Sequence, residues 1–378
     1  MSSTAPQPSS TTVSRKSENG GTLPSLTGLR WVAAFLVFGF HLCLVEYFKP
    51  GPEARMITAV FRPGSVGVSF FFILSGFVLM WACPSTGFRK FWWRRFARVY
   101  PLHIATAILV AILLLTYKPW ELPSPWVAVA NVFLVQAWSP ELDYLQSLNT
   151  VSWTLSVEAF FYLTFPLLAL GVTRLNRRGV VATGAGALAA TTLGPAAGLL
   201  FAGREQVDWF FHWTPVGRLP EFVLGITLAL LVRSWRPQRL LPLWCAAGAL
   251  TVGGYFLSIH VPEPWGYAAC TMPGFALLLF TAAVADLSKR WTPWRNRTMV
   301  RLGEWSFAFY LVHLLVVRLF EATIGYHPKF PPGKGAALTV ATFLLSLGAA
   351  WLLHAAVERP ARGVLLNRRR RMRKLRPS

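Results

Sequence analysis

Two ionisable residues, Arg30 and His41, lie in one apolar segment, LTGLRWVAAFLVFGFHL, which is too hydrophobic for an ordinary soluble helix. The eleven residues between them correspond to roughly 16 Å of helix, so the cation lies near one membrane interface and the imidazole lies inside the hydrocarbon. An imidazole buried there is costly and usually has a task, so we regard His41 as a candidate catalytic base. A histidine that only hydrogen-bonds between packed helices gives the same pattern.

A second candidate group is the arginine pair Arg95 and Arg98 in the run RRFAR. Residues three apart share a helix face, and this face lies at the cytoplasmic mouth of a predicted span. Two guanidinium groups offer paired planar donors that suit phosphate oxygens. The alternative is that these arginines only set the membrane topology. The positive-inside rule explains the presence of arginines at this place, but it does not explain their spacing.

A carboxylate, Glu158, lies about two turns into another predicted span, in SWTLSVEAFFY, with Trp153 and Ser156 on nearby turns. At that depth it must be paired, protonated or facing a wet cavity. We expect it to pair with His41, because the topology below puts both in the outer half of the membrane. A protonated glutamate that joins two helices is the alternative. Trp153 and Ser156 are candidate substrate-binding residues.

A late apolar segment, SFAFYLVHLLV, carries His313 one turn after Tyr310. We count both as candidate substrate-binding residues, although a single histidine here suits packing equally well. In GRLPEFVLG, Arg218 and Glu221 are three residues apart, and we favour a self-contained ion pair over catalysis for them.

Composition determines the class of protein. The 378 residues are 54% apolar and only 14% charged, the mean hydropathy is +0.45, and long apolar runs recur along the chain, as in an all-α polytopic membrane protein. The net charge of +22 falls in short clusters between these runs, so we exclude nucleic-acid binding. The four cysteines are scattered without metal spacing, so we read them as packing residues and expect no metal site.

We expect about ten transmembrane helices. Basic clusters between them place both termini in the cytoplasm of a multi-pass cell-membrane protein. A further apolar stretch, 126–138, is predicted to be re-entrant or interfacial, because a crossing there would put every later basic cluster outside. The predicted spans are 29–48, 66–82, 99–117, 152–171, 180–202, 218–233, 240–259, 266–286, 305–324 and 336–357.

The two ends of the chain differ from this pattern. Residues 1–24 are rich in Ser, Thr, Pro and Gly, which predicts a disordered cytoplasmic tail. Residues 363–378 are dominated by arginine and predict a basic cytoplasmic tail near anionic headgroups.

The motifs, in this order and spacing, resemble the acyltransferase-3 family of integral-membrane acyltransferases, with a match from about residue 24 to 362. Residues 25–362 are then one membrane-embedded acyltransferase domain. The resemblance rests on Arg30 with His41, GVSFFFILSGF at 67–77, Arg95 and Arg98 before YPL, the run ending at Glu158, RLPEFVLG at 218–225, SFAFYLVH ending at His313, and VERPAR at 357–362.

The resemblance implies transfer of an acyl group from an acyl-thioester, usually acetyl-coenzyme A, to a hydroxyl of a sugar or glycoconjugate. It implies that His41 is catalytic and that Arg30, Arg95 and Arg98 are needed for activity, as donor-binding residues. The opening LPSLTGLRWVAAFLVFGFHL is most similar to the macrolide-tailoring branch, which acylates antibiotic lactones or their sugars. Acyl-coenzyme A is a co-substrate in this scheme, and no permanently bound cofactor is expected.

Two chemical routes remain open at this point. His41 takes the proton of the acceptor hydroxyl, with Glu158 fixing its tautomer, or His41 is itself acylated and passes the group on. A different class of protein, a transporter or flippase, would use an intramembrane His and Glu to relay protons or bind a substrate. The basic cluster suited to a phosphate-bearing donor favours the enzyme.

Overall fold

The computed structural model describes residues 21–82 and 87–374. Over these residues the protein is helical, and one isolated bridge between Phe48 and Phe330 is the only β pairing. The predicted all-α fold class is therefore confirmed. Most of the predicted tail 1–24, Cys83 and the last four residues of the predicted tail 363–378 lie outside the described residues.

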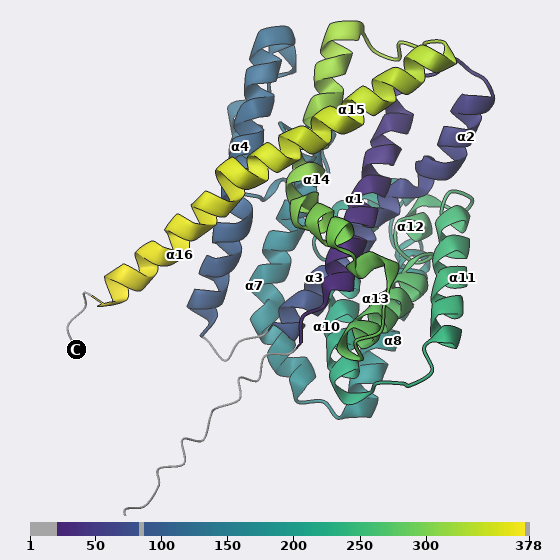
Figure 1. The fold of residues 1–378 in the computed structure, drawn as a ribbon, viewed down its shortest axis with the longest axis vertical. Helices are drawn as coiled ribbons and strands as arrows, with labels where there is room; N and C mark the ends of the chain where they lie inside the picture. Colours follow the sequence, from purple (N-terminus) through teal and green to yellow (C-terminus); the bar gives the residue numbers. More distant parts are fainter. Residues whose placement is uncertain (1–20, 83–86, 375–378) are drawn as a thin grey trace, which may run out of the picture.

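Each predicted span contains a helix in the described chain, and these helices form one bundle (Figure 1). In chain order they are α1 (Pro24–Val45), α3 (Gly67–Trp81), α4 (Phe88–Tyr117), α7 (Trp153–Thr173), α8 (Arg177–Gly198), α10 (Leu219–Ser234), α11 (Leu241–Leu257), α13 (Met272–Leu287), α14 (Arg297–Ile324) and α15 (Pro332–Leu353).

Seven helical stretches of the described residues are long and apolar enough to cross a membrane. One of them joins α2 (Pro52–Phe61) to α3 through a 3-10 turn, and another continues α15 through a π-helical turn into α16 (Arg359–Lys374), the long oblique helix of Figure 1. The helices α10, α11 and α13 have 16 or 17 residues and occupy the remaining predicted spans. The chain is a multi-pass helical membrane protein.

The apolar stretch 126–138 does not cross the bundle. It forms α5 (Pro125–Val132), eight residues long, followed by a short 3-10 turn, Gln136–Trp138. Eight residues of helix reach only about 12 Å, well short of a membrane. Asn131 of α5 is buried, and its side-chain amide donates to the carbonyl of Ser147 at 2.9 Å. The prediction that this segment does not span is confirmed.

A buried polar contact holds the start of α1, the helix that carries Arg30 and His41. The backbone N–H and the hydroxyl of Ser25 donate to the carboxylate of Asp286, at the end of α13, at 2.8 and 2.7 Å. This carboxylate satisfies helix N-terminal donors that no cap residue of α1 satisfies. Because Asp286 also carries negative charge at a helix N-terminus, the contact fixes the height of α1 in the bundle.

Helices α3 and α10 cross in close contact. A Cβ atom built on Gly225 would lie 1.9 Å from the carbonyl oxygen of Ile73, and one on Gly76 would lie 2.0 Å from that of Phe222. The two backbones therefore touch at positions where glycine has no side chain, as small residues allow between membrane helices. This crossing sets the position of Arg218 and Glu221 at the start of α10.

Candidate active site

His41 of α1 and His313 of α14 lie side by side, although 272 residues separate them in sequence. Nε2 of His313 is 3.1 Å from Nδ1 of His41. One turn before them, the rings of Phe38 and Phe309 pack with centroids 5.5 Å apart, so two aromatic residues hold the helices at the distance that brings the imidazoles together.

The hydrogen bonds of this pair determine the tautomer of each ring. Nδ1 of His41 lies 2.9 Å from the carbonyl oxygen of Val37, and Nδ1 of His313 lies 3.1 Å from that of Phe309. A carbonyl oxygen only accepts, so each Nδ1 carries a proton and each neutral ring keeps its lone pair on Nε2. Nε2 of His313 then accepts from Nδ1–H of His41. The basic atom of His41 is Nε2.

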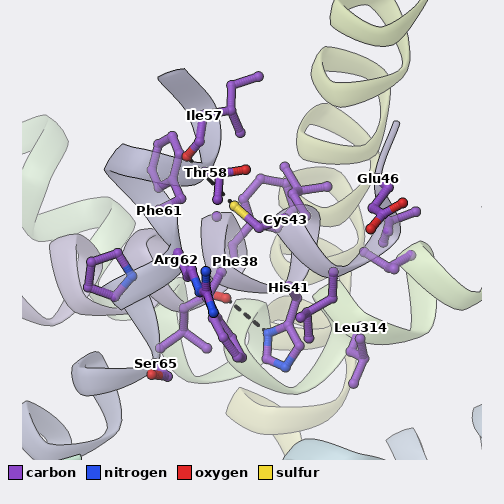
Figure 2. Close-up of a pocket in the computed structure, with 18 of the residues that line it drawn as sticks. Phe38, His41, Cys43, Glu46, Ile57, Thr58, Phe61, Arg62, Ser65 and Leu314 are labelled. Atoms are coloured by element: carbon purple, nitrogen blue, oxygen red, sulfur yellow. Dashed lines mark hydrogen bonds between the residues drawn. The ribbon is translucent and has the colours of Figure 1, made fainter. Parts of the chain in front are cut away.

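His41 lines a large cavity, named here the histidine cavity, with a volume of about 1400 Å³. Figure 2 shows His41 from α1, Ile57 and Phe61 from α2, and Arg62 from the following turn around this hollow. Ala54, Ile57, Thr58 and Phe61 follow the helical spacing of one face of α2, and all four line the cavity. The wall is mostly apolar with a few charged groups, as in sites for large organic ligands.

A second cavity of about 730 Å³, named here the arginine cavity, contains the other predicted charged residues. Arg30 of α1, Arg95 and Arg98 of α4, and Glu158 of α7 all line it. The hydroxyl of Tyr162 donates to Glu158 at 2.7 Å. With Arg233, four guanidinium groups against one carboxylate leave this cavity positive. Nε of Arg95 is buried and has no hydrogen-bond partner among the described residues, so it is available to an anionic ligand.

The expected pairing of Glu158 with His41 is wrong. Glu158 binds Tyr162 and lies among the arginines, whereas His41 binds Val37 and His313 and lines the other cavity. Residue counts along a span indicate only the depth of a side chain in the membrane. Depth does not determine which faces of two helices meet, and α14, rather than α7, packs along α1. A backbone carbonyl and a second histidine take the place of the expected carboxylate.

The two cavities share Tyr310 and Val68 in their walls. The hydroxyl of Tyr310 lies 3.1 Å from Oγ1 of Thr154, and its ring centroid lies 6.0 Å from that of His313. The arginine cavity reaches the residues before α1, and the histidine cavity reaches the residues after it. The cavities therefore lie at opposite ends of α1 and meet near the histidine pair.

The remaining predicted residues have different surroundings. Trp153 lines the histidine cavity and packs against Trp213, with the two ring centroids 4.7 Å apart. His313 is fully buried behind His41. Ser156 lines neither cavity, and its hydroxyl accepts from the backbone N–H of Ala137 at 3.3 Å. Direct contact of Ser156 with a substrate is therefore not supported, because its hydroxyl joins α7 to the segment after α5.

Sequence reasoning missed three residues of these cavities. Tyr162 stands four residues after Glu158, a helical spacing that would have revealed it. His212, in the short helix α9 (Arg204–Trp213), packs against Tyr267 with the two rings tilted and their centroids 3.5 Å apart, and no periodic pattern marks it. Arg318 lies one and a half turns after His313 on α14, and its guanidinium donates to the carbonyl of Leu148 at 2.9 Å.

Comparison with known proteins agrees with this arrangement. The chain matches the acyltransferase-3 family, described as "Acyltransferase domain", over residues 23–355. It is 37% identical to Acyltransferase MdmB of Streptomyces mycarofaciens over 365 residues, which are 92% of this chain and 93% of that protein. It is 24% identical to O-acetyltransferase OatA of Staphylococcus aureus (strain NCTC 8325 / PS 47), over 78% of this chain and 50% of that protein.

A further relative, Peptidoglycan O-acetyltransferase OatA of Listeria monocytogenes, is 28% identical over 39% of this chain and 24% of its own length. No solved structure gives a significant match. The fold and the two cavities are those of a helical membrane protein with a histidine pair at one cavity and a cationic group at the other. The chain belongs to the acyltransferase-3 family, and it is an enzyme that transfers acyl groups.

Proposed function

We propose that the protein transfers an acetyl group from acetyl-coenzyme A to a hydroxyl of a macrolide or of a sugar attached to one. The observation that carries the proposal is the pair of cavities of opposite chemistry that share Tyr310, with His41 lining the histidine cavity. The arginine cavity suits a polyanionic donor, and the histidine cavity suits a large, largely apolar acceptor.

The donor proposal rests on charge. Coenzyme A carries phosphates, and Arg30, Arg95 and Arg98 offer planar paired donors for them. Glu158, which lines the same cavity and accepts a hydrogen bond from Tyr162, compensates part of this charge when the cavity is empty. The extended pantetheine arm carries the thioester from the arginines toward Tyr310. The phosphates then stay near the cytoplasm, where coenzyme A is found.

The acceptor proposal rests on size. Cavities that bind drug-sized ligands measure about 300–1000 Å³, and the histidine cavity measures about 1400 Å³. A single sugar would leave most of it empty, whereas a macrolide with its sugars would fill it. The motif resemblance to the macrolide-tailoring branch supports the same class of acceptor, and the O-acetyltransferase names of two relatives support acetyl transfer to oxygen.

His41 supplies the proton chemistry in this proposal. Its Nε2 takes the proton of the acceptor hydroxyl as that oxygen attacks the thioester. Nε2 of His313 accepts from Nδ1–H of His41 and stabilises the imidazolium that forms. Acylation of Nε2 itself, followed by transfer to the acceptor, uses the same atom. A label-trapping experiment separates the two routes: labelled donor without acceptor marks His41 only in the covalent route.

The test compares purified wild-type protein with His41→Ala, using labelled acetyl-coenzyme A and a panel of macrolide aglycones, macrolide glycosides and free sugars. We expect acetylated macrolide from the wild type and a loss of about 10²–10⁴ in turnover for His41→Ala, the usual cost of removing a general base. Donor affinity should be retained, because His41 lies outside the arginine cavity.

His260→Ala is the matched control, because this histidine is exposed and lines neither cavity. It should retain wild-type turnover. Near-normal turnover by His41→Ala would exclude His41 as the base or the acylated group. Acetylation of free sugars but of no macrolide would contradict the proposed acceptor.

A further inference from the structure

A buried guanidinium group, that of Arg218, belongs to the wall of the histidine cavity. Arg218, the residue that precedes α10, is only 2% exposed and lines this cavity together with Trp153 and Tyr310. It is close enough to Tyr310 for the two side chains to interact electrostatically. Arg218 therefore lies near the wall that the two cavities share, on the path between the proposed donor site and His41.

The protein uses only part of the hydrogen-bonding capacity of Arg218. Nε lies 3.0 Å from a carboxylate oxygen of Glu221, and Nη2 donates to the hydroxyl of Ser69 at 3.0 Å. The guanidinium carbon lies 5.2 Å from the ring centroid of Phe72. Nε and Nη1 are both buried and make no hydrogen bond among the described residues, but Nε lies within ion-pair distance of Glu221 and Nη1 has no such partner. An ion pair alone would not require this spare donor.

A buried cation with a spare donor binds an oxygen atom that carries negative charge. Glu221 neutralises Arg218 in the resting enzyme, so a permanent anion gains little by binding there. A ligand whose oxygen becomes negative only during the reaction gains the most, because a preorganised donor in a dry site needs no rearrangement. In an acyl transfer, that oxygen is the carbonyl oxygen of the acyl group.

We propose that Arg218 is a further catalytic residue, which donates from Nη1 to the carbonyl oxygen of the acyl group during transfer. This inference rests on the proposed function. It revises the sequence interpretation, in which Arg218 and Glu221 only neutralise one another: the ion pair is present, and one donor of its arginine remains for the substrate.

The acceptor oxygen forms a bond to the carbonyl carbon, its proton moves to Nε2 of His41, and the carbonyl π electrons move to the oxygen that Arg218 holds. Collapse of this intermediate restores the carbonyl, breaks the carbon–sulfur bond and returns the proton to the departing thiolate, which leaves as coenzyme A thiol. The same oxygen becomes negative if Nε2 of His41 attacks first, so the role of Arg218 holds for both routes.

The decisive variant removes both members of the ion pair, Arg218→Met with Glu221→Leu. Replacing a buried ion pair by apolar residues of similar volume usually preserves the fold, whereas removing one partner leaves a buried charge. We expect the double variant to keep the wild-type thermal unfolding temperature but to lose about 10²–10³ in kcat, the cost of one lost oxyanion donor. A folded double variant with wild-type kcat would overturn the proposal.

Two unreactive donor analogues provide a readout that does not depend on activity. The first replaces the thioester sulfur of acetyl-coenzyme A by CH₂ and keeps the carbonyl as a ketone, and the second also replaces the carbonyl by CH₂. We expect the wild type to bind the ketone about tenfold or more tightly, as for one hydrogen bond from a charged donor. The difference should shrink in Arg218→Lys, which keeps the charge opposite Glu221 and loses the planar fork.

The outcomes separate this inference from the proposed function. Equal affinity of the wild type for both analogues would show that Arg218 does not hold the carbonyl, while acetyl-coenzyme A could still be the donor. Failure of the wild type to bind either analogue or to use acetyl-coenzyme A would overturn the proposed donor, and the role of Arg218 would fall with it. Should the double variant not fold, Arg218→Lys decides the matter by kcat and by analogue affinity.

Discussion

The chemistry of His41 depends on atoms outside its own side chain. The carbonyl oxygen of Val37 and Nε2 of His313 both lie within hydrogen-bond distance of Nδ1, so the proton is held there and Nε2 is left as the basic atom. Carboxylates usually orient a catalytic histidine, because they also stabilise the imidazolium. A neutral imidazole partner avoids placing a second full charge in a membrane, where an unpaired carboxylate is costly.

At the same scale, we expect Arg98→Ala to weaken donor binding by about 1.5–3 kcal/mol, the scale of a hydrogen bond to a charged group. The acceptor KM should hardly change, because Arg98 lines only the arginine cavity. Arg98→Lys should restore part of the affinity, since an ammonium keeps the charge and loses the planar fork. Titration with coenzyme A at two salt concentrations measures these effects.

Arg301→Ala is the control for that experiment. It removes the same charge from an exposed position on α14 that lines neither cavity, so donor affinity should be unchanged. If Arg98→Ala and Arg301→Ala had the same donor affinity as the wild type, Arg98 would serve only as a topology signal.

At the scale of elements, α1 connects the two cavities. Arg30 in its first half belongs to the donor side, and His41 near its end belongs to the acceptor side. Asp286 of α13 holds its start, and α14 packs along it and supplies His313. A shift of α1 by one residue along its axis, about 1.5 Å, would separate the imidazoles. The close packing around α1 therefore serves the geometry of the site as well as stability.

The α3–α10 crossing can be tested by enlarging one glycine. Gly225→Ala places a methyl group against the carbonyl oxygen of Ile73, so the helices must separate and the start of α10 with Arg218 must move. We expect a loss of about 1–3 kcal/mol in the free energy of unfolding, the usual cost of overpacking, together with lower kcat. Thermal unfolding in detergent and turnover measure the two effects.

Gly248→Ala on α11 is the matched control, because a Cβ atom there meets nothing within 4 Å. Alanine also favours a helix over glycine by up to about 1 kcal/mol, so this variant should be neutral or slightly more stable. Equal destabilisation by both substitutions would show that the close crossing is not required.

At the scale of the whole molecule, the two cavities open toward opposite ends of α1, so orientation in the membrane decides which side each substrate enters. The basic clusters flank the ends of the helices on the side of the arginine cavity, where Arg233 also lies. By the positive-inside rule this side faces the cytoplasm. We propose on this basis that both termini are cytoplasmic and that the acceptor enters from the opposite face.

Reporter fusions test this orientation. Fusions after residues 90, 176 and 296 should report the cytoplasm, and fusions near 145, 206 and 328 should report the exterior, because charge asymmetry sets the direction of each crossing. A cytoplasmic signal at 145 would contradict the proposed orientation of this part of the chain.

By itself, the sequence determined the class of fold, the positions of the spans and the chemistry available inside them. Apolar runs of membrane length can only be helices, because backbone polar groups in lipid must be satisfied within the segment, and the charges that interrupt such runs are conspicuous. For this reason Arg30, His41, Arg95, Arg98 and Glu158 could all be found without a structure, and each of them lines a cavity.

Only the tertiary structure decided which of these groups meet. Helical periodicity reports the faces of one helix, but it carries no information about which neighbour packs against each face. The sequence placed Glu158 at the depth of His41, whereas packing places it with the arginines. His313 contacts His41 across 272 residues of chain, and Arg218 contacts Ser69 across 149 residues. No local pattern connects the residues of either pair.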